Sequence, residues 1–316
     1  MCLAKQYVDN YYIYNYYNLT KNWNCRLGET HINTKSIYFL TVNYYSTQLI
    51  QKLINSIKLI TDLFSHIVII NNSTDDKSIY QLQNNKTIII NSETNLGYGK
   101  GCNLGLSWIY NQNPQAIVWL INPDAYLLPD SLEKAHHFLG KNPEISILGT
   151  TVYEPTGKVW FGGGNFIPET GKIIANNFFY KTETSITDWV TGCSMLINMN
   201  NFEKCPEFDE DYFLYYEDFD FCRRYKKQGH KIAITQTISV IHQPSSITSK
   251  QPGLKLEYSI YSYLLSLAKH TNKLVLIYRL LRITIAALVS LLIDYKIARV
   301  KIKAISKFIR CNRRFL

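Results

Sequence analysis

The chain has 316 residues, 46% of them hydrophobic and 18% charged, with a net charge of +10. This length can bury a sizeable core, and the composition excludes a wholly disordered protein. The seven scattered cysteines form no Cys-x-x-Cys pair, which argues against a zinc site and a disulfide framework and favours a reducing cytosol. Residues 1–34 show neither helical nor strand periodicity and no secretory signal, so we expect an irregular extension there.

Short apolar runs alternate with helical patterns in the next hundred residues. This alternation predicts an α/β fold with a mostly parallel, Rossmann-like sheet that helices cover on both faces. Ligands of such sheets bind beyond the carboxyl ends of the strands. We expect strands at residues 37–42, 67–70, 87–90 and 116–121, and helices at residues 48–63 and 102–110.

Polar clusters follow three of these strands. The cluster at residues 95–101 holds three glycines, which favours either a phosphate near a helix start or a plain tight turn. Asn122-Pro123-Asp124 places a carboxylate on a stiff turn, either as an oxygen ligand for Mg²⁺ or Mn²⁺ or as an Asx cap. The cluster at residues 71–76 is either a binding loop or a turn.

The second half of the chain is less regular. Residues 157–171 contain a Gly-Gly-Gly run, which predicts a structural hairpin, with a substrate-side loop as the alternative. Strands are expected at residues 195–197, 232–234 and 238–241, and a basic helix at residues 219–228 that ends at Gly229. His242 closes the last strand, either as a structural residue or as a metal ligand.

Glu217 and Asp218 are adjacent carboxylates that follow an aromatic run. Repulsion between the two charges and burial against aromatic rings can raise the pKa of one of them toward that of a general base. The alternative is a helix N-terminus, where acidic side chains complement the macrodipole.

The C-terminal segment is apolar and then basic. Residues 274–293 have the hydropathy of a membrane span, but Arg279 and Arg282 interrupt them, and Asp294 closes the run. The following helix is expected to have one apolar and one basic stripe. We therefore predict one or two amphipathic helices on an anionic membrane surface. The alternatives are a helical pair packed on the domain and a nucleic-acid-binding tail, although the tail has no interleaved aromatic platform.

Several blocks, taken together, resemble family-2 glycosyltransferases of the GT-A fold, in particular the rhamnosyltransferase-like branch. The resemblance covers about residues 36–270. The matching blocks are Thr-Val-Asn-Tyr at 41–44, Asn-Asn-Ser-Thr-Asp-Asp at 71–76, the glycine segment at 95–105, Ile-Asn-Pro-Asp at 121–124, Gly-Cys-Ser-Met-Leu-Ile at 192–197, and the long acidic and aromatic block at 208–224. Two positions depart from the pattern, because Asn71 and Asn122 replace aspartates that many members carry.

The resemblance implies an inverting transfer of a sugar from a nucleoside diphosphate donor to a hydroxyl of a glycan or lipid-linked acceptor. Asp218 would be the general base, with Glu217 as the second candidate, and Asp124 with His242 would hold Mg²⁺ or Mn²⁺. The implied donor-binding residues are Thr41, Asn43, Asn72, Asp76, Asn95, Gly97 and Asn103, and the implied acceptor-side residues are Trp189 and Gly192. A rhamnose-like sugar is the leading guess, in cell-surface polysaccharide assembly.

The implied organisation is an extension at 1–34, a glycosyltransferase domain at 35–270 and a basic helical tail at 271–316. We expect a cytoplasmic protein on the inner face of the plasma membrane, with no nucleic-acid partner. The rival hypotheses are an inactive scaffold of the same fold, which Asn71 and Asn122 keep open, and a basic nucleic-acid-binding protein. A nucleotidyltransferase shares the architecture but usually needs a phosphate-gripping loop that the turn at 43–45 does not supply.

Overall fold

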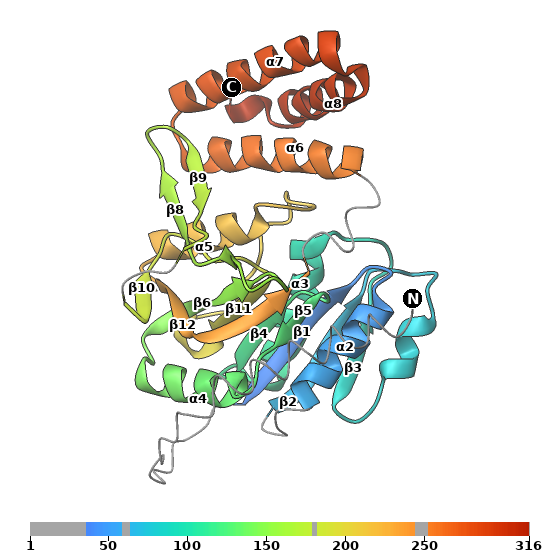
Figure 1. The fold of residues 1–316 in the computed structure, drawn as a ribbon, viewed down its shortest axis with the longest axis vertical. Helices are drawn as coiled ribbons and strands as arrows, with labels where there is room; N and C mark the ends of the chain where they lie inside the picture. Colours follow the sequence, from blue (N-terminus) through green and yellow to red (C-terminus); the bar gives the residue numbers. More distant parts are fainter. Residues whose placement is uncertain (1–35, 59–63, 179–181, 244–251, 316) are drawn as a thin grey trace. The chain divides into compact units, whose positions relative to one another are not determined.

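The computed structural model describes residues 36–58, 64–178, 182–243 and 252–315 (Figure 1). All of them fall within one unit, Thr34–Leu316. The extension expected at residues 1–34 lies outside the described residues, as do the last residues of the helix expected at 48–63.

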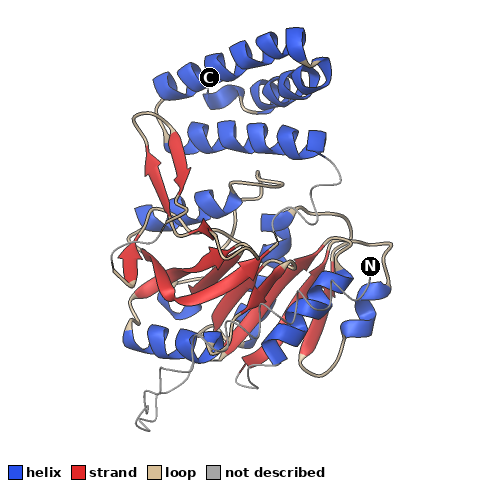
Figure 2. Cartoon of the chain, viewed as in Figure 1, coloured by secondary structure: helices blue, strands red, loops and turns tan. Residues whose placement is uncertain are grey.

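A single large sheet forms the centre of this unit (Figure 2). The order of its strands is β10-β12-β6-β11-β4-β1-β2-β3. Strands β4, β1, β2 and β3 are parallel, and β11 runs antiparallel between β4 and β6. The expected α/β fold is confirmed. The strands are β1 Ile37–Asn43, β2 Phe64–Asn71, β3 Thr87–Asn91, β4 Ile117–Ile121, β5 Ala125–Leu127, β6 Ile145–Tyr153, β7 Val159–Phe161, β8 Gly164–Ile167, β9 Lys172–Ala175, β10 Thr184–Ile186, β11 Ser194–Asn198 and β12 Lys231–His242.

Helices pack on this sheet and continue beyond it (Figure 1). Apolar side chains of α3 contact β1 and β2, while α4 and α5 contact β12. The helices are α2 Thr47–Lys58, α3 Tyr98–Gln112, α4 Ser131–Lys141, α5 Glu217–Lys227, α6 Pro252–His270, α7 Lys273–Ile293 and α8 Tyr295–Cys311, with short 3-10 turns η1 Ser78–Leu82, η2 Met199–Asn201 and η4 Arg313–Phe315.

Two local predictions need adjustment, and a third is confirmed. Helix α3 begins at Tyr98, four residues earlier than expected, because Gly97 adopts a left-handed φ of 80° that turns the chain directly into the helix. The two short strands expected at 232–234 and 238–241 form one strand, β12, with a register irregularity between Thr235 and Ser239. The hairpin expected in the glycine-rich segment is confirmed as β8 and β9, which pair antiparallel.

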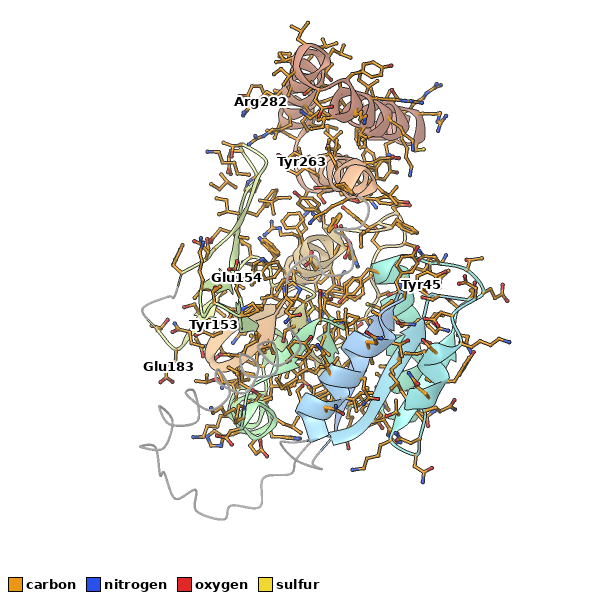
Figure 3. All side chains as sticks on the ribbon, turned by 45° about the vertical axis from the view of Figure 1, so that its right-hand side comes forward. Tyr45, Tyr153, Glu154, Glu183, Tyr263 and Arg282 are labelled. Carbon is orange, nitrogen blue, oxygen red and sulfur yellow. The ribbon has the colours of Figure 1, made fainter. Side chains whose placement is uncertain are left out.

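Helices α6, α7 and α8 pack on one another and share a separate apolar cluster, whose buried members include Leu264, Leu276, Ile305 and Phe308. Much of the apolar stripe of α8 therefore faces the neighbouring helices. The hairpin β8–β9 reaches this group, because Tyr263 Oη donates a hydrogen bond to the carbonyl oxygen of Gly171 over 2.9 Å (Figure 3).

Helix α7 is a single 21-residue helix, and 11% of its most apolar stretch is buried. Among the described residues, it is the helix that is long and apolar enough to cross a membrane by length and composition. Its exposed side chains include Leu281, Ile285, Leu288 and Leu292, and Arg282 is exposed beside them (Figure 3). Most of the exposed large apolar side chains of residues 271–316 therefore lie on α7.

Candidate active site

Amide side chains join the carboxyl ends of β1, β2 and β3. Asn43 Nδ2 donates to Asn71 Oδ1 over 2.9 Å, and Asn71 Nδ2 donates to Asn91 Oδ1 over 3.0 Å. The backbone N–H and hydroxyl of Ser46 both donate to Asn43 Oδ1. Thr41 is buried on β1, and its hydroxyl has no hydrogen-bond partner among the described residues. These amide hydrogen bonds hold the ends of the three strands together.

Asn72 connects the end of β2 to the glycine segment. Its Nδ2 donates to the carbonyl oxygen of Gly97 over 2.8 Å, and Asn95 Oδ1 accepts from the backbone N–H of Gly97 over 3.0 Å. A Cβ atom at position 97 would lie 2.1 Å from the carbonyl oxygen of Phe213, so only glycine fits there. This segment is therefore shaped to lie against the chain that precedes α5.

Two other predicted donor residues have their side chains engaged within the protein. Asn103 donates to the carbonyl oxygen of Phe208 over 2.9 Å and accepts from its backbone N–H over 2.7 Å. Asp76 accepts from the backbone N–H of Ser78 over 2.9 Å, in an Asx turn. The hydrogen bonds of Asn103 connect α3 to the loop before α5. Binding of the sugar donor by Asn103 and Asp76 stays a prediction.

Glu217 and Asp218 occupy the first turn of α5. The predicted position of this pair at a helix N-terminus is therefore confirmed. Asp218 Oδ2 accepts from the backbone N–H of Gly192 over 2.9 Å, and Oδ1 accepts from that of Phe219 over 2.8 Å. Asp218 is partly exposed, whereas Glu217 is 5% exposed and its Oε2 has no hydrogen-bond partner among the described residues. Asp218 can be reached by a substrate, and Glu217 lies behind it.

Burial raises the pKa of both carboxyl groups. For Glu217, burial and then the charge of Asp218 raise the pKa from 4.5 to about 8. For Asp218, burial raises the pKa, while hydrogen bonds from Gly192 and Phe219 oppose the rise. These backbone donors stabilise the anion of Asp218, and Glu217 Oε2 has no such donor. The backbone donors therefore favour the charge of the pair on Asp218, and burial without such donors favours the proton on Glu217.

Asp124 and His242 meet although 118 positions separate them in the sequence. His242 Nε2 lies 3.2 Å from Asp124 Oδ1, and both side chains are buried. His242 Nδ1 has no hydrogen-bond partner among the described residues. The pair offers one carboxylate oxygen and one imidazole nitrogen, which are donor types that bind Mg²⁺ or Mn²⁺, and among the described residues no third His, Cys, Asp or Glu completes a cluster with them.

The segment Thr191-Gly192-Cys193 joins the two carboxylate centres. The N–H of Gly192 holds Asp218, and the carbonyl oxygen of the next residue, Cys193, accepts from the N–H of Asn122 over 3.0 Å. Tyr98 Oη, at the start of α3, donates to the carbonyl oxygen of Gly192 over 2.7 Å. The glycine segment, the turn before Asp124 and the start of α5 therefore converge on one short stretch of chain.

Sequence reasoning assigned no site role to Tyr98 and Cys193. Cys193 acts through its main chain, which leaves no signal in its side-chain type. The bond between Tyr98 and Gly192 joins positions 94 residues apart, so periodicity could not have found it.

An aromatic wall lies beside these centres. The Trp189 ring is 5.0 Å from that of Phe161 and 6.2 Å from that of Phe219, and its Nε1 has no hydrogen-bond partner among the described residues. Trp160 places its ring 4.6 Å from that of His242. The predicted acceptor residue Trp189 thus belongs to a buried aromatic cluster that includes Phe219 of α5.

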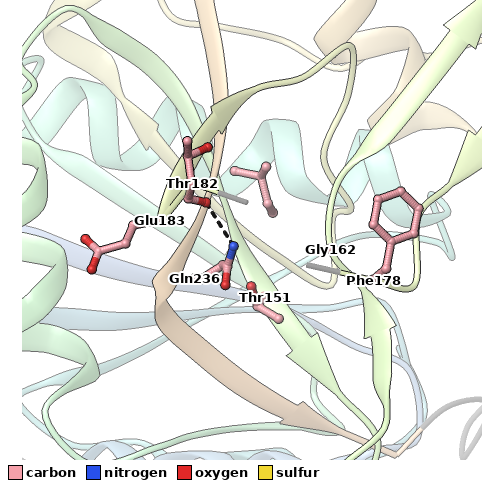
Figure 4. Close-up of a pocket in the computed structure, with 7 residues that line it drawn as sticks. Thr151, Gly162, Phe178, Thr182, Glu183 and Gln236 are labelled. Atoms are coloured by element: carbon pink, nitrogen blue, oxygen red, sulfur yellow. Dashed lines mark hydrogen bonds between the residues drawn. The ribbon is translucent and has the colours of Figure 1, made fainter. Parts of the chain in front are cut away.

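A small pocket lies elsewhere, over β6 and β12 (Figure 4). Gln236 Nε2 donates to the carbonyl oxygen of Thr182 across it over 2.9 Å. None of its described lining residues is a predicted site residue. The described lining residues are Thr151, Gly162, Phe178, Thr182, Glu183, Ile234 and Gln236.

The parallel β3-β2-β1-β4 half, the antiparallel β11 and the carboxylates at the strand ends define a glycosyltransferase of the GT-A fold. The sequence model of glycosyl transferase family 2 matches residues 36–205. The chain therefore belongs to glycosyl transferase family 2.

Individual relatives agree with this assignment. The chain is 24% identical over 249 residues to the low-salt glycan biosynthesis hexosyltransferase Agl10 of Haloferax volcanii, which covers 75% of each chain. It is 33% identical over 58 residues to the rhamnosyltransferase WbbL of Escherichia coli K12, which covers 18% of this chain and 22% of WbbL. The crystal structure of GalNAc-T7 with UDP, GalNAc and Mn²⁺ shares the fold, with a TM-score of 0.55 and 14% identity over 75% of this chain and 48% of that one.

Proposed function

We propose that the protein transfers a hexose, with inversion, from a nucleoside diphosphate sugar to a hydroxyl of a glycan or lipid-linked acceptor. The similarity to a glycan biosynthesis hexosyltransferase over three quarters of both chains supports the hexose and the polysaccharide context. The shorter match to a rhamnosyltransferase supports a rhamnose-like sugar. The transfer forms a bond from the acceptor oxygen to the anomeric carbon and breaks the bond from that carbon to the diphosphate.

The observation that carries this proposal is the junction at Gly192 and Cys193. One main-chain group there holds Asp218, and the neighbouring residue holds the turn that carries Asp124. Inverting transfer needs a base on the acceptor side and charge neutralisation on the leaving-group side, at opposite ends of one reacting carbon. The junction fixes the two centres next to each other at the carboxyl edge of the sheet.

Asp218 is the proposed general base. Its partly exposed carboxylate is held by two backbone N–H groups, so its position is set before the acceptor arrives. A carboxylate accepts up to about four hydrogen bonds, which leaves room for the acceptor hydroxyl. The raised pKa makes it a stronger base, and Glu217 keeps the second charge of the pair out of the site.

Asp124 and His242 are the proposed ligands of Mg²⁺ or Mn²⁺. Such an ion neutralises the developing charge on the leaving diphosphate. Trp160 packs against the His242 ring and limits its rotation, so the Nε2 atom stays directed at Asp124. Thr41 lies at the end of β1 with its unpaired buried hydroxyl, where we place the nucleoside. Trp189 supplies an apolar wall on the acceptor side.

We also propose that the protein binds the cytoplasmic face of a membrane through α7. The exposed side chains of that helix are mostly apolar, and the chain after Asp294 carries basic residues without acidic ones. An apolar face with flanking positive charge suits an anionic lipid surface. Of the two helices predicted to lie on the membrane, α7 supports the proposal more strongly, because Ile305 and Phe308 of α8 are buried.

A thermal-shift panel of nucleoside diphosphate sugars, with and without Mn²⁺, tests the proposed site. A donor present at 100 times its dissociation constant should stabilise the fold by about 2.7 kcal/mol. We expect one donor to give a metal-dependent shift, and Asp124→Ala to abolish it. Asp130→Ala is the matched control, because Asp130 lies at the start of α4 and should leave the shift unchanged. No shift with any donor would favour the inactive scaffold.

A further inference from the structure

Helix α6 contacts the whole turn that delivers the carboxylate pair. This turn, residues 209–216, connects the loop held by Asn103 to the start of α5. The contacts come from residues spaced three or four positions apart, which places them along one face of α6. Both helices lie beyond the residues matched by the family model, which ends at residue 205. The contacts between α6 and the turn before α5 therefore lie outside the segment that the family model describes.

Charged contacts fix the beginning of the turn. Lys269 Nζ lies 2.5 Å from Asp209 Oδ2 and 2.7 Å from Asp211 Oδ2. Tyr212, which is fully buried, places its hydroxyl 3.2 Å from Ser266 Oγ. The C-terminal part of α6 thus holds the first half of the turn with an ion pair and a buried hydrogen bond.

The end of the turn has an unusual backbone that α6 also contacts. Tyr215 and Tyr216 have φ angles of 67° and 63°, in the left-handed region that side chains other than glycine rarely adopt. Two such residues in succession are unfavourable and need support from the surrounding structure. Ser262 Oγ donates to the carbonyl oxygen of Leu214 over 2.8 Å, and Tyr263 packs its ring 5.7 Å from that of Tyr216.

A buried charge network joins α6 to α5 itself. His270 Nε2 lies 2.8 Å from Asp220 Oδ1, and Arg224 Nε lies 2.7 Å from Asp220 Oδ2. Burial opposes the charge of Asp220, but the hydrogen bond from His270 and the Arg224 guanidinium outweigh it and lower the pKa of that carboxyl. Asp220 is two residues after Asp218 in the same helical turn, so its position sets the orientation of that turn.

We propose that α6 is a splint for the catalytic turn, and that His270 is a positioning residue that aligns Asp218 through Asp220. This inference rests on the proposed role of Asp218 as the base. The opposite side of α6 bonds to α8, since Lys303 Nζ lies 2.8 Å from Glu257 Oε2. The splint thereby connects the catalytic turn to the helices of the tail.

His270→Ala tests the splint, with His270→Gln as the conservative variant that keeps a donor near the position of Nε2. In His270→Ala, amide hydrogen exchange of residues 209–220 should become at least about tenfold faster, because a hydrogen bond to a charged group is lost. The kcat should fall about 10- to 100-fold with the donor KM within about twofold, as expected from a misplaced base. His270→Gln should recover most of both.

His230→Ala is the matched control, because it removes a histidine that packs on Phe202 and on Tyr225 of α5 and bonds to Ser146, whereas the described contacts of His230 with other side chains include none with α6. It should change neither readout. If His270→Ala does not fold, Ser262→Ala removes the bond to Leu214 with little loss of volume and should speed exchange in the same peptide. Unchanged exchange in a folded variant, or equal losses in the alanine and glutamine variants, would overturn the proposal. A wild type without transferase activity would refute the proposed function, while hydrogen exchange would still test the splint.

Discussion

Replacing Glu217 with glutamine tests the electrostatic description of the carboxylate pair. Burial and the neighbouring charge raise the pKa of Glu217 from 4.5 to about 8, so the folded protein binds this proton more tightly than the unfolded chain. The stability that the proton contributes is fully present below about pH 4.5 and is lost as the pH rises toward 8. At 1.36 kcal/mol per pH unit, the loss over this range is about 5 kcal/mol. Glutamine keeps the shape of the side chain and has no proton to lose.

The assay is urea unfolding of the wild type and of Glu217→Gln between pH 5 and pH 8.5. The free energy of unfolding of the variant, relative to the wild type, should rise by about 1.4 kcal/mol per pH unit up to pH 8 and then level off. Glu210→Gln is the matched control, because Glu210 is exposed and should give no such slope. In an Asp218→Asn background, the rise should level off at a lower pH, because the neighbouring charge that raises the pKa of Glu217 has been removed. Parallel curves for Glu217→Gln and wild type would refute this electrostatic description.

Two further predictions concern the base and the tail. Asp218→Asn should lower kcat by about 10²- to 10⁴-fold and leave the donor-induced thermal shift intact, because it removes proton transfer but not donor binding; retention of wild-type kcat would exclude Asp218 as the base. The double variant Leu281→Asp, Ile285→Asp should abolish sedimentation with anionic liposomes, because it puts two carboxylates on the exposed apolar face of α7. The control is the double variant Ser306→Asp, Ile309→Asp on α8, which should weaken sedimentation less. Equal sedimentation of all three proteins would exclude α7 as the lipid-binding surface.

The local elements could be predicted from the sequence because their causes are local. Strands β1, β2, β3 and β4 are continuous apolar runs, since both faces of a covered parallel sheet are buried. Parallel strands also end at one edge, which predicts that polar residues such as Asn43, Asn71 and Asp124 gather there. The acidic and aromatic block around Glu217 and Asp218 was specific enough to indicate both the fold and the place of the carboxylates.

The tertiary structure decided which polar side chains are engaged within the protein. Asn103 and Asp76 have residue types that suit a donor site, but their polar atoms bond within the protein. By contrast, the hydroxyl of Thr41 and the Nδ1 atom of His242 form no hydrogen bond with the described residues. Such differences depend on what lies opposite each side chain in space, and spacing along the chain carries no record of it.

The tertiary structure also decided the direction of each amphipathic face and the contacts between distant segments. The apolar stripe of α8 was expected to meet lipid, but Ile305 and Phe308 pack against α6 and α7, because a helix buries its apolar side against the nearest apolar partner. The approach of Asp124 to His242 and the splint from His270 to Asp220 arise from packing between elements far apart in the chain. The sequence alone determines where strands, helices and chemically active residues occur, since these depend on local periodicity and residue type, whereas their assembly into a site depends on long-range packing.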